Sequence, residues 1–150
     1  MTGAPGGGAP PPAMPGRVVA LDYGAARCGV AVSDPTGTLA TPLEAVLRPR
    51  TRRGFNRLLA VVREHAPVAV VVGLPLSLSG EDSAQTVETR EFAARLAERL
   101  SVSVRLFDER FTTALAQRRR GEAPEDSRAA AVLLEDWLRS QSRSDHDLTN

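Results

Sequence analysis

The sequence contains no lysine, no isoleucine and only one cysteine, Cys28. A single cysteine excludes a disulfide within the chain and a cysteine-rich zinc site. Because its neighbours are mostly apolar, we expect Cys28 to be a buried structural thiol. All 19 basic residues are arginine, and a GC-rich genome explains that bias without any functional requirement. The choice of arginine over lysine therefore carries no functional weight.

Long apolar runs are also missing. No stretch approaches the roughly 20 apolar residues that a membrane-spanning helix needs. The N-terminus does not combine a positively charged region with an apolar one, as a signal peptide would. We therefore expect a cytoplasmic protein with no membrane partner. The net charge of +1 does not by itself indicate a polyanionic ligand, as that of a strongly basic domain would.

The arginines are nevertheless clustered. One cluster comprises Arg48, Arg50, Arg52, Arg53 and Arg57, and the other comprises Arg118, Arg119 and Arg120. Such clusters can form an ordinary solvated surface or a track for nucleic-acid phosphates. The sequence leaves both interpretations open.

The length of 150 residues suits one domain. Residues 1–15 are almost wholly glycine, alanine and proline, so they cannot bury enough apolar surface to fold, and we expect a disordered tail. Residues 141–150 are polar, and we expect a flexible tail there as well. The folded domain is predicted over residues 16–140.

The domain is predicted to begin with a β-hairpin. Residues 17–23 (RVVALDY) and 28–33 (CGVAVS) are strand-like runs joined by a short glycine-containing connection. Asp34, Pro35 and Gly37 stand where a type I turn prefers them, and a third strand is expected at about residues 39–47.

The rest of the domain is predicted to alternate between helices and strands. A helix containing Phe55 and Val62 should end near His65, because Pro67 cannot continue it. Residues 68–74 contain no polar side chain, which is typical of a parallel strand buried on both faces. The later elements are expected to be a helix at 82–100 with Val87 on its apolar side, a strand at 102–107, a short helix from 112 or 113 to 120, and a helix from 126 to about 140. This order predicts an α/β fold, a mixed five-stranded sheet flanked by helices.

Acidic residues follow the predicted strands at positions suited to chemistry. Asp22 ends the first strand, and the carboxyl edge of such sheets is where ligands bind. Glu109 follows the strand ending at Phe107 and should reach the same edge if that strand is parallel to the first. Asp108 is either a further carboxylate or the start of a turn. Asp126 stands in the first turn of the last helix, where capping alone would also explain it.

Three carboxylates from separate elements would suit Mg²⁺ or Mn²⁺, which prefer oxygen ligands and retain water for substrate phosphates. Such ions generate hydroxide and stabilise a leaving oxygen in phosphodiester hydrolysis. His65, at a helix end, and His146, in the polar tail, are not expected to contribute.

Other residues near these acids are candidates for binding substrate. Gly73, Pro75 and Gly80 belong to a loop at the carboxyl end of the fourth strand, which could hold a phosphate backbone or simply connect two elements. Arg27 and Arg110 flank the acids and either contact phosphate or pair with a carboxylate. We favour substrate contact for Arg110, and we include Thr112 and the Arg118, Arg119 and Arg120 cluster among the substrate-binding candidates.

Five blocks of this sequence resemble a known family. They are Asp22-Tyr23-Gly24 with Arg27, Gly29-Val30-Ala31 and Ser33-Asp34, then Val72 to Leu76 with Gly80, Phe92-Ala93 with Leu96, Asp108 to Thr113, and Asp126-Ser127 with Ala129-Ala130. In this order they are similar to the YqgF family, also called RuvX, whose members are described as Holliday junction resolvases. The resemblance covers about residues 17–139.

The resemblance implies an RNase H-like fold and metal-dependent cleavage of nucleic acid. It implies a role in maturing the 5′ end of the 16S ribosomal RNA precursor or in resolving branched DNA. It also implies that Asp22, Glu109 and Asp126 are the catalytic acids and hold Mg²⁺ or Mn²⁺. Many RNase H-like nucleases carry an acid at the end of the fourth strand, where this chain has Gly73, and Phe111 replaces the leucine that is more usual in its block.

The expected partner is therefore a nucleic acid, either structured RNA or branched or single-stranded DNA, and the sequence leaves a homodimer open. An actin-like ATPase would share the fold, but the chain has room for one domain only and lacks a phosphate-binding G-x-x-x-x-G-K-[ST] loop. The remaining alternative is a non-catalytic RNA-binding or ribosome-associated module in which the acids serve as caps and turns.

Overall fold

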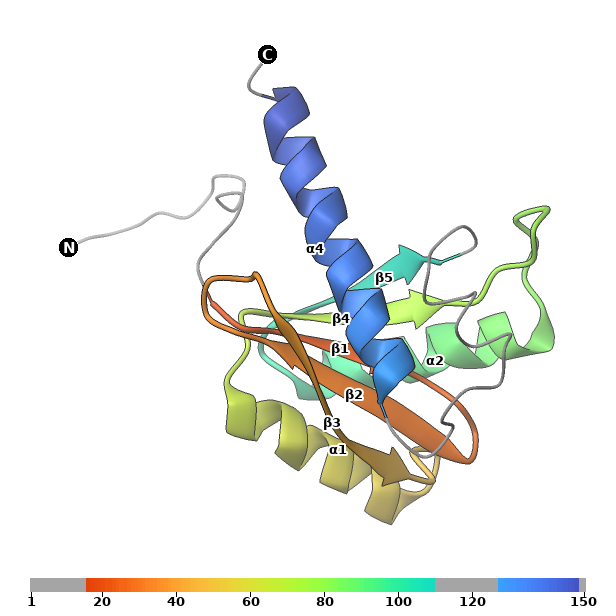
Figure 1. The fold of residues 1–150 in the computed structure, drawn as a ribbon. Helices are drawn as coiled ribbons and strands as arrows, with labels where there is room; N and C mark the ends of the chain where they lie inside the picture. The colour runs from red at the N-terminus through yellow and green to blue at the C-terminus, as the bar shows by residue number, and fades with distance from the viewer. Residues whose placement is uncertain (1–15, 110–126, 149–150) are drawn as a thin grey trace.

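The computed structural model of the chain describes residues 16–109 and 127–148 (Figure 1). In chain order its elements are β1 (Val18–Asp22), β2 (Arg27–Ser33), β3 (Ala40–Leu47), α1 (Arg52–His65), β4 (Ala69–Leu74), α2 (Ala84–Arg99), β5 (Ser103–Asp108) and α4 (Arg128–Leu148). The predicted order of strands and helices is confirmed for these residues. The predicted short helix at 112–120 lies outside them.

The five strands form one mixed sheet in the order β3-β2-β1-β4-β5. β2 is antiparallel to both β1 and β3, whereas β1, β4 and β5 are parallel. The carboxyl ends of β1, β3, β4 and β5 therefore lie at one edge of the sheet, which we call the carboxyl edge. The fold class predicted from the sequence is confirmed.

Helices cover both faces of this sheet. Figure 1 shows α4 on one face and α1 with α2 on the other. Val19 and Leu21 of β1 pack in the core beneath α1 and α2, whereas Val18 and Ala20 pack against α4. Because side chains alternate along a strand, the next residue, Asp22, projects toward the α4 face at the carboxyl edge.

The helix boundaries follow from capping residues. Thr51 precedes α1 and its hydroxyl accepts a hydrogen bond from Gly54 N–H at 3.0 Å. The helix ends at His65, followed by Ala66 in the left-handed conformation and then Pro67. Ser83 caps α2: its side chain accepts a hydrogen bond from Thr86 N–H, and the Thr86 side chain accepts one from Ser83 N–H. Both caps therefore supply acceptors to backbone N–H groups that would otherwise lack partners.

Two details of the helices differ from the predictions. Val87 was expected on the apolar side of α2 but is 46% exposed, while Thr86 and Thr89 are buried. Their hydroxyls donate to the carbonyls of Pro75 and Gln85, so both buried hydroxyls have a hydrogen-bond partner. α4 was expected to end near Ser140 but continues to Leu148, because no proline or glycine interrupts that segment of the expected polar tail.

Within the ranges 16–109 and 127–148, no helix combines the length and apolar character required to cross a membrane.

Candidate active site

Asp22 stands at the carboxyl edge, half-buried at the end of β1. Leu21 is level with Val72 of β4, so Asp22 is level with Gly73 on the neighbouring strand. On the other side Asp22 pairs with Gly29 of β2, and a methyl group built at Gly29 would lie 3.5 Å from Asp22 Cβ. Glycines thus flank Asp22 on both neighbouring strands and leave space around its carboxylate on the α4 face.

The Glu109 carboxylate occupies the space that Gly73 leaves. Glu109 follows β5 directly and is fully buried. A methyl group built at Gly73 would lie only 2.8 Å from Glu109 Oε2 and 3.0 Å from Leu133 Cδ2 of α4. The Glu109 side chain therefore extends from the edge strand β5 over its neighbour β4, on the face that α4 covers.

This position brings Glu109 toward Asp22. β1 and β5 both neighbour β4, at a spacing of about 4.8 Å between adjacent strands. A carboxylate above Gly73 is thus roughly one strand spacing from Asp22, although the two acids come from strands that do not touch. The sequence prediction that both acids reach the same edge agrees with this arrangement.

The burial of Glu109 is itself informative. Taking a carboxylate out of water is unfavourable unless cations or hydrogen-bond donors compensate, and such groups are concentrated at functional sites. Glu109 is one of the largest fully buried side chains among the described residues. The fold therefore places an acid among fully buried side chains at the carboxyl edge.

Asp126, the third predicted acid, lies outside the described residues, but its neighbour Ser127 is described. Ser127 is buried, and its hydroxyl oxygen accepts a hydrogen bond from Val30 N–H at 2.8 Å. The Ser127 Cα would be 3.6 Å from a methyl group at Gly29, the residue paired with Asp22. Ser127 thus fixes the start of α4 beside Asp22.

Sequence reasoning did not single out Ser127 as functional. Its one signal was its place directly after an acid, in the block that contains Ala129 and Ala130. The hydrogen bond between Ser127 and Val30 N–H could not be deduced from the sequence. The irregular register between β2 and β3 near Cys28 and Val30 depends on tertiary structure.

No group of three or more histidine, cysteine, aspartate or glutamate side chains is gathered as a metal site within the described ranges. Asp22 and Glu109 supply two carboxylates there, so a complete ligand set would require a group from outside these ranges.

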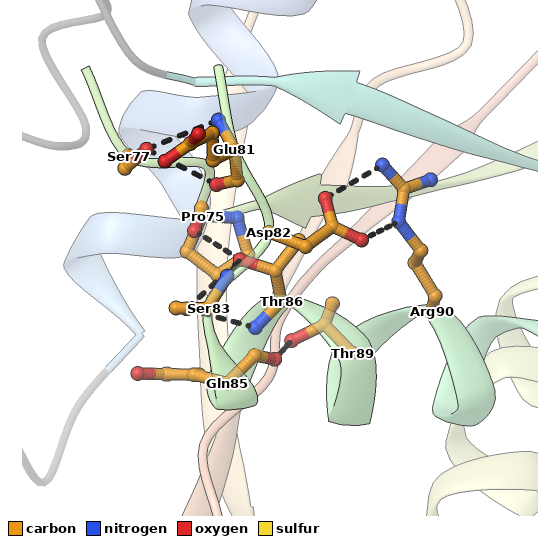
Figure 2. A network of polar contacts seen from close by, with 9 residues as sticks. All are labelled: Pro75, Ser77, Glu81, Asp82, Ser83, Gln85, Thr86, Thr89 and Arg90. Atoms are coloured by element: carbon orange, nitrogen blue, oxygen red, sulfur yellow. Dashed lines mark hydrogen bonds and ion pairs between the residues drawn. The ribbon is translucent and has the colours of Figure 1, made fainter. Parts of the chain in front are cut away.

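The loop after β4 is held by its own polar contacts (Figure 2). Thr86 Oγ1 donates to Pro75 C=O at 2.7 Å, and Ser77 Oγ accepts from Glu81 N–H at 3.1 Å. Arg90 pairs with Asp82 at 2.9 Å at the far end of the loop. These bonds tie the loop to the start of α2 and give the Gly73 to Pro75 segment a defined course at the carboxyl edge.

A second set of contacts lies at the carboxyl edge on the opposite face of the sheet, which α1 and α2 cover. Tyr23, the residue after Asp22, packs its ring on Phe92 with 4.4 Å between centroids and donates from its hydroxyl to Glu88 Oε2 at 2.5 Å. Arg50 Nε is 3.4 Å from the same Glu88 oxygen. Burial, and then the hydrogen bond to Glu88, raise the pKa of Tyr23, so Tyr23 remains a neutral donor that joins β1 to α2.

Cys28 is fully buried, as predicted. Burial, reinforced by the negative charge of Asp22, raises the pKa of its thiol well above the usual value. A neutral thiol is a poor nucleophile and metal ligand, so Cys28 contributes packing.

The structure describes some of the predicted basic residues and not others. Arg27 begins β2 at the carboxyl edge, and strand alternation places it on the same face as Gly29. Arg110, Thr112, Arg118, Arg119 and Arg120 lie outside the described residues. The cluster around Arg48 to Arg53 follows the end of β3 and so also lies at the carboxyl edge, toward the face that α1 covers.

A hollow of about 510 Å³ between the β2–β3 turn and α4 lies at the other end of the sheet, lined by Gly37, Thr38, Glu135, Leu138, Arg139 and Ser142. Neither Asp22 nor Glu109 lines it.

Comparison with known proteins identifies the family of this chain. The family model of RuvX, described as Holliday junction resolvase, matches residues 16–140. A protein of Koribacter versatilis named "Putative pre-16S rRNA nuclease" is 42% identical over 138 residues, which cover 85% of this chain and 90% of that protein. A Rhodococcus erythropolis protein of the same name is also 42% identical, covering 86% of this chain and 81% of that protein.

The fold is shared with solved structures. RuvC of T. thermophilus in complex with a Holliday junction substrate superposes with a TM-score of 0.53 and 21% identity, over 85% of this chain and 95% of that one. A second Thermus thermophilus RuvC structure gives a TM-score of 0.52 and 19% identity, over 87% and 96% of the two chains. The sheet and its covering helices are thus RNase H-like, and the match over residues 16–140 together with the 42% identical relatives shows that this chain belongs to the RuvX family.

Proposed function

We propose that this protein is a metal-dependent nuclease that hydrolyses nucleic-acid phosphodiester bonds at the carboxyl edge. The observation that carries the proposal is the placement of the Glu109 carboxylate over Gly73, on the same face and edge as Asp22. A buried acid that extends over β4 toward another acid is well suited to share a cation with it.

The residues present fit Mg²⁺ or Mn²⁺. Both ions favour carboxylate oxygens, and Mg²⁺ binds to one or two protein carboxylates while its other positions take water and substrate phosphate. We propose that Asp22 and Glu109 hold the ion, with Asp126 as the third ligand. Ser127 supports this assignment, because its bond to Val30 N–H fixes the chain beside Asp22. When bound, such an ion activates water and stabilises the departing oxygen.

The other residues of the edge would bind and orient the substrate. Arg27, on the Asp22 face at the start of β2, is suited to a phosphate oxygen, because a guanidinium group binds phosphates through paired N–H groups. The Gly73 to Pro75 backbone permits close approach of a strand, and its loop is ordered by the bonds to Thr86 and Glu81. We assign substrate contacts to Arg110, Thr112, Arg118, Arg119 and Arg120 on the sequence alone.

The relatives narrow the substrate to two classes. The Koribacter versatilis and Rhodococcus erythropolis proteins are named for the 16S ribosomal RNA precursor, whereas the family is described by Holliday junctions. We propose processing of the 5′ end of that precursor as the primary role, because the 42% identical relatives carry this name. Resolution of branched DNA is the second activity to test.

A cleavage assay on matched substrates tests the proposal. The purified chain is incubated with a 16S precursor fragment, a four-way DNA junction and single-stranded DNA, each with Mn²⁺, with Mg²⁺ and with excess chelator. We expect cleavage of at least one substrate that requires metal and is lost in Asp22→Asn. Nucleic-acid binding with no cleavage under any metal condition would instead favour a non-catalytic module, and cleavage in excess chelator would refute the metal mechanism.

A further inference from the structure

A hollow between α1 and α2, on the sheet face opposite α4, is lined by arginines. Arg52 and Asn56 of α1 and Arg95 and Arg99 of α2 surround it, and its volume is about 450 Å³. The fifth lining residue, Phe55, is buried and forms its apolar floor. Among the residues that the structure describes, no acidic side chain lines this hollow.

Within residues 16–109 and 127–148, no acidic side chain forms an ion pair with the arginines of the hollow. In the part of the chain that the structure describes, Arg50, Arg57 and Arg90 form ion pairs with Glu88, Glu44 and Asp82. The same residues show no ion pair for Arg52, Arg95 or Arg99. Three arginines therefore line one concave surface, and their charge is available to an anion.

One of these groups is held in place without an acidic partner. The guanidinium carbon of Arg95 lies over the Phe55 ring, 4.2 Å from its centroid. Phe55 is itself fixed by an edge-to-face contact with Phe92 at 6.3 Å. A guanidinium group over an aromatic ring keeps its N–H groups free for hydrogen bonds, so Arg95 is preorganised to bind a phosphate oxygen.

The ends of the two helices are also joined at this surface. Arg63 Nη2 of α1 donates to the Arg99 carbonyl at 2.6 Å. This bond connects the end of α2 to α1, and Arg99 lies one helical turn after Arg95 on α2. Several cations on one surface favour a ligand with several negative charges.

The hollow is connected to the carboxyl edge by further arginines. β3 runs in the same direction as β1, so its end and the start of α1 lie at that edge. Arg48 and Arg50 stand between β3 and α1, and Arg52, in the first turn of α1, lines the hollow. Arg48 and Arg52 thus place positive charge between the carboxyl edge and the hollow, while Arg50 is paired with Glu88.

We infer that the hollow lined by Arg52, Arg95 and Arg99 binds backbone phosphates of the nucleic-acid substrate at a distance from the cleavage site. This inference rests on the proposed nuclease function. It assigns to the α1–α2 face a substrate surface that holds the part of a long or branched molecule extending beyond the carboxyl edge. Because phosphate contacts carry no base information, this surface should be indifferent to sequence.

Charge reversal tests the inference. We compare Arg95→Glu/Arg99→Glu with Arg17→Glu/Arg105→Glu, which changes the net charge equally at exposed arginines that do not line the hollow. Affinity for a four-way junction and for a short oligonucleotide is measured by fluorescence anisotropy over a range of salt. The hollow variant should bind the junction more weakly, with a salt slope reduced by about 0.7 to 0.9 for each phosphate that it no longer binds.

The short oligonucleotide separates this inference from the proposed function. If it is cleaved at the wild-type rate by the hollow variant while junction binding is weakened, both proposals stand. Unchanged junction affinity and slope, or an equal loss in the control variant, would overturn the hollow inference without affecting the nuclease proposal. Absence of any cleavage by the wild type would contradict the nuclease proposal alone.

Because Arg95 covers Phe55, its replacement could disturb folding. Arg52→Glu/Arg99→Glu leaves Arg95 in place and provides a second test of the same surface, with melting temperature as the control.

Competition by millimolar inorganic phosphate distinguishes a general anion site, which it would saturate, from a surface that requires a connected backbone. Full competition by free phosphate would overturn the inference of a backbone-binding surface.

Discussion

Adding one methyl group at Gly73 should disable the site with little effect on the fold. In Gly73→Ala the new Cβ would lie 2.8 Å from Glu109 Oε2 and 3.0 Å from Leu133 Cδ2. Gly73 is not among the glycines with a positive φ, so alanine meets no backbone strain there. The effect of the substitution is therefore steric and falls on two identified side chains.

The size of the effect follows from these distances. Ordinary contacts are about 3.5 to 4.0 Å, so the Glu109 carboxylate must retreat by about 1 Å. A displacement of that size in an active site can reduce the rate about 100-fold. Overpacking of a core costs about 1 to 3 kcal/mol, which for a chain of this size lowers the melting temperature by about 2 to 4 °C per kcal/mol.

Gly29→Ala is the matched control. It adds the same methyl group on the other neighbour of β1, where the nearest atoms, Ala130 Cβ and Asp22 Cβ, are both at 3.5 Å. We expect Gly29→Ala to retain most cleavage activity and Gly73→Ala to lose it. Equal activity in both variants would refute the placement of Glu109 over Gly73 as a functional requirement.

A thermodynamic cycle gives an independent measurement. If Glu109 is the group that the methyl displaces, Gly73→Ala should destabilise the wild type more than it destabilises Glu109→Ala. The two substitutions should then show a coupling free energy of about 0.5 kcal/mol or more, because the effects of contacting residues are not additive. Additive effects would mean that the two residues do not meet.

Other substitutions test the supporting contacts. Ser127→Ala leaves the Val30 N–H without its acceptor, and we expect thermal unfolding to show a loss of about 1 to 3 kcal/mol together with reduced cleavage; full activity would remove Ser127 from the site. Tyr23 has a raised pKa, so wild-type stability should fall as the pH rises above about 10, where the unfolded chain loses its tyrosine proton. Tyr23→Phe lacks this group, and an identical pH profile in its melting curve would contradict the raised pKa that burial and the Glu88 hydrogen bond give Tyr23. Replacing Arg118, Arg119 and Arg120 by glutamate should weaken binding of all sequences and reduce the salt slope, whereas unchanged anisotropy titrations would assign them to ordinary surface.

Much of the fold could be predicted because local signals and tertiary structure agree. The run of apolar residues at 69–74 is buried on both faces, as its composition requires. Asp34 and Gly37 indicated a turn. The Gly37 N–H donates a hydrogen bond to the Asp34 carbonyl at 2.9 Å, which closes this turn. Pro67 and the Thr51 cap delimit α1 for equally local reasons.

The errors arise where tertiary contacts override local patterns. Helical periodicity favoured Val87 for the core, but Thr86 is buried instead, and the carbonyl of Pro75 provides a partner for its hydroxyl. α4 is longer than its apolar pattern because polar residues can continue a helix that packing has already established.

The site was predictable in part. Asp22 and Glu109 could be placed at the carboxyl edge from the strands that they follow. The relation between Glu109 and Gly73 could not be predicted, because it depends on β4 lying between β1 and β5 and on the direction of one side chain. The hollow between α1 and α2 was equally inaccessible, since Arg52 and Arg95 are brought together only by helix packing.

The most direct test of the account is Mn²⁺ binding, measured by titration calorimetry on wild type, Asp22→Asn and Glu109→Gln, with melting curves to confirm folding. Removing either carboxylate should weaken Mn²⁺ binding at least about tenfold, the lower range found even for residues that only support metal ligands. Unchanged Mn²⁺ affinity in both folded variants would contradict the claim that Asp22 and Glu109 share one cation at the carboxyl edge.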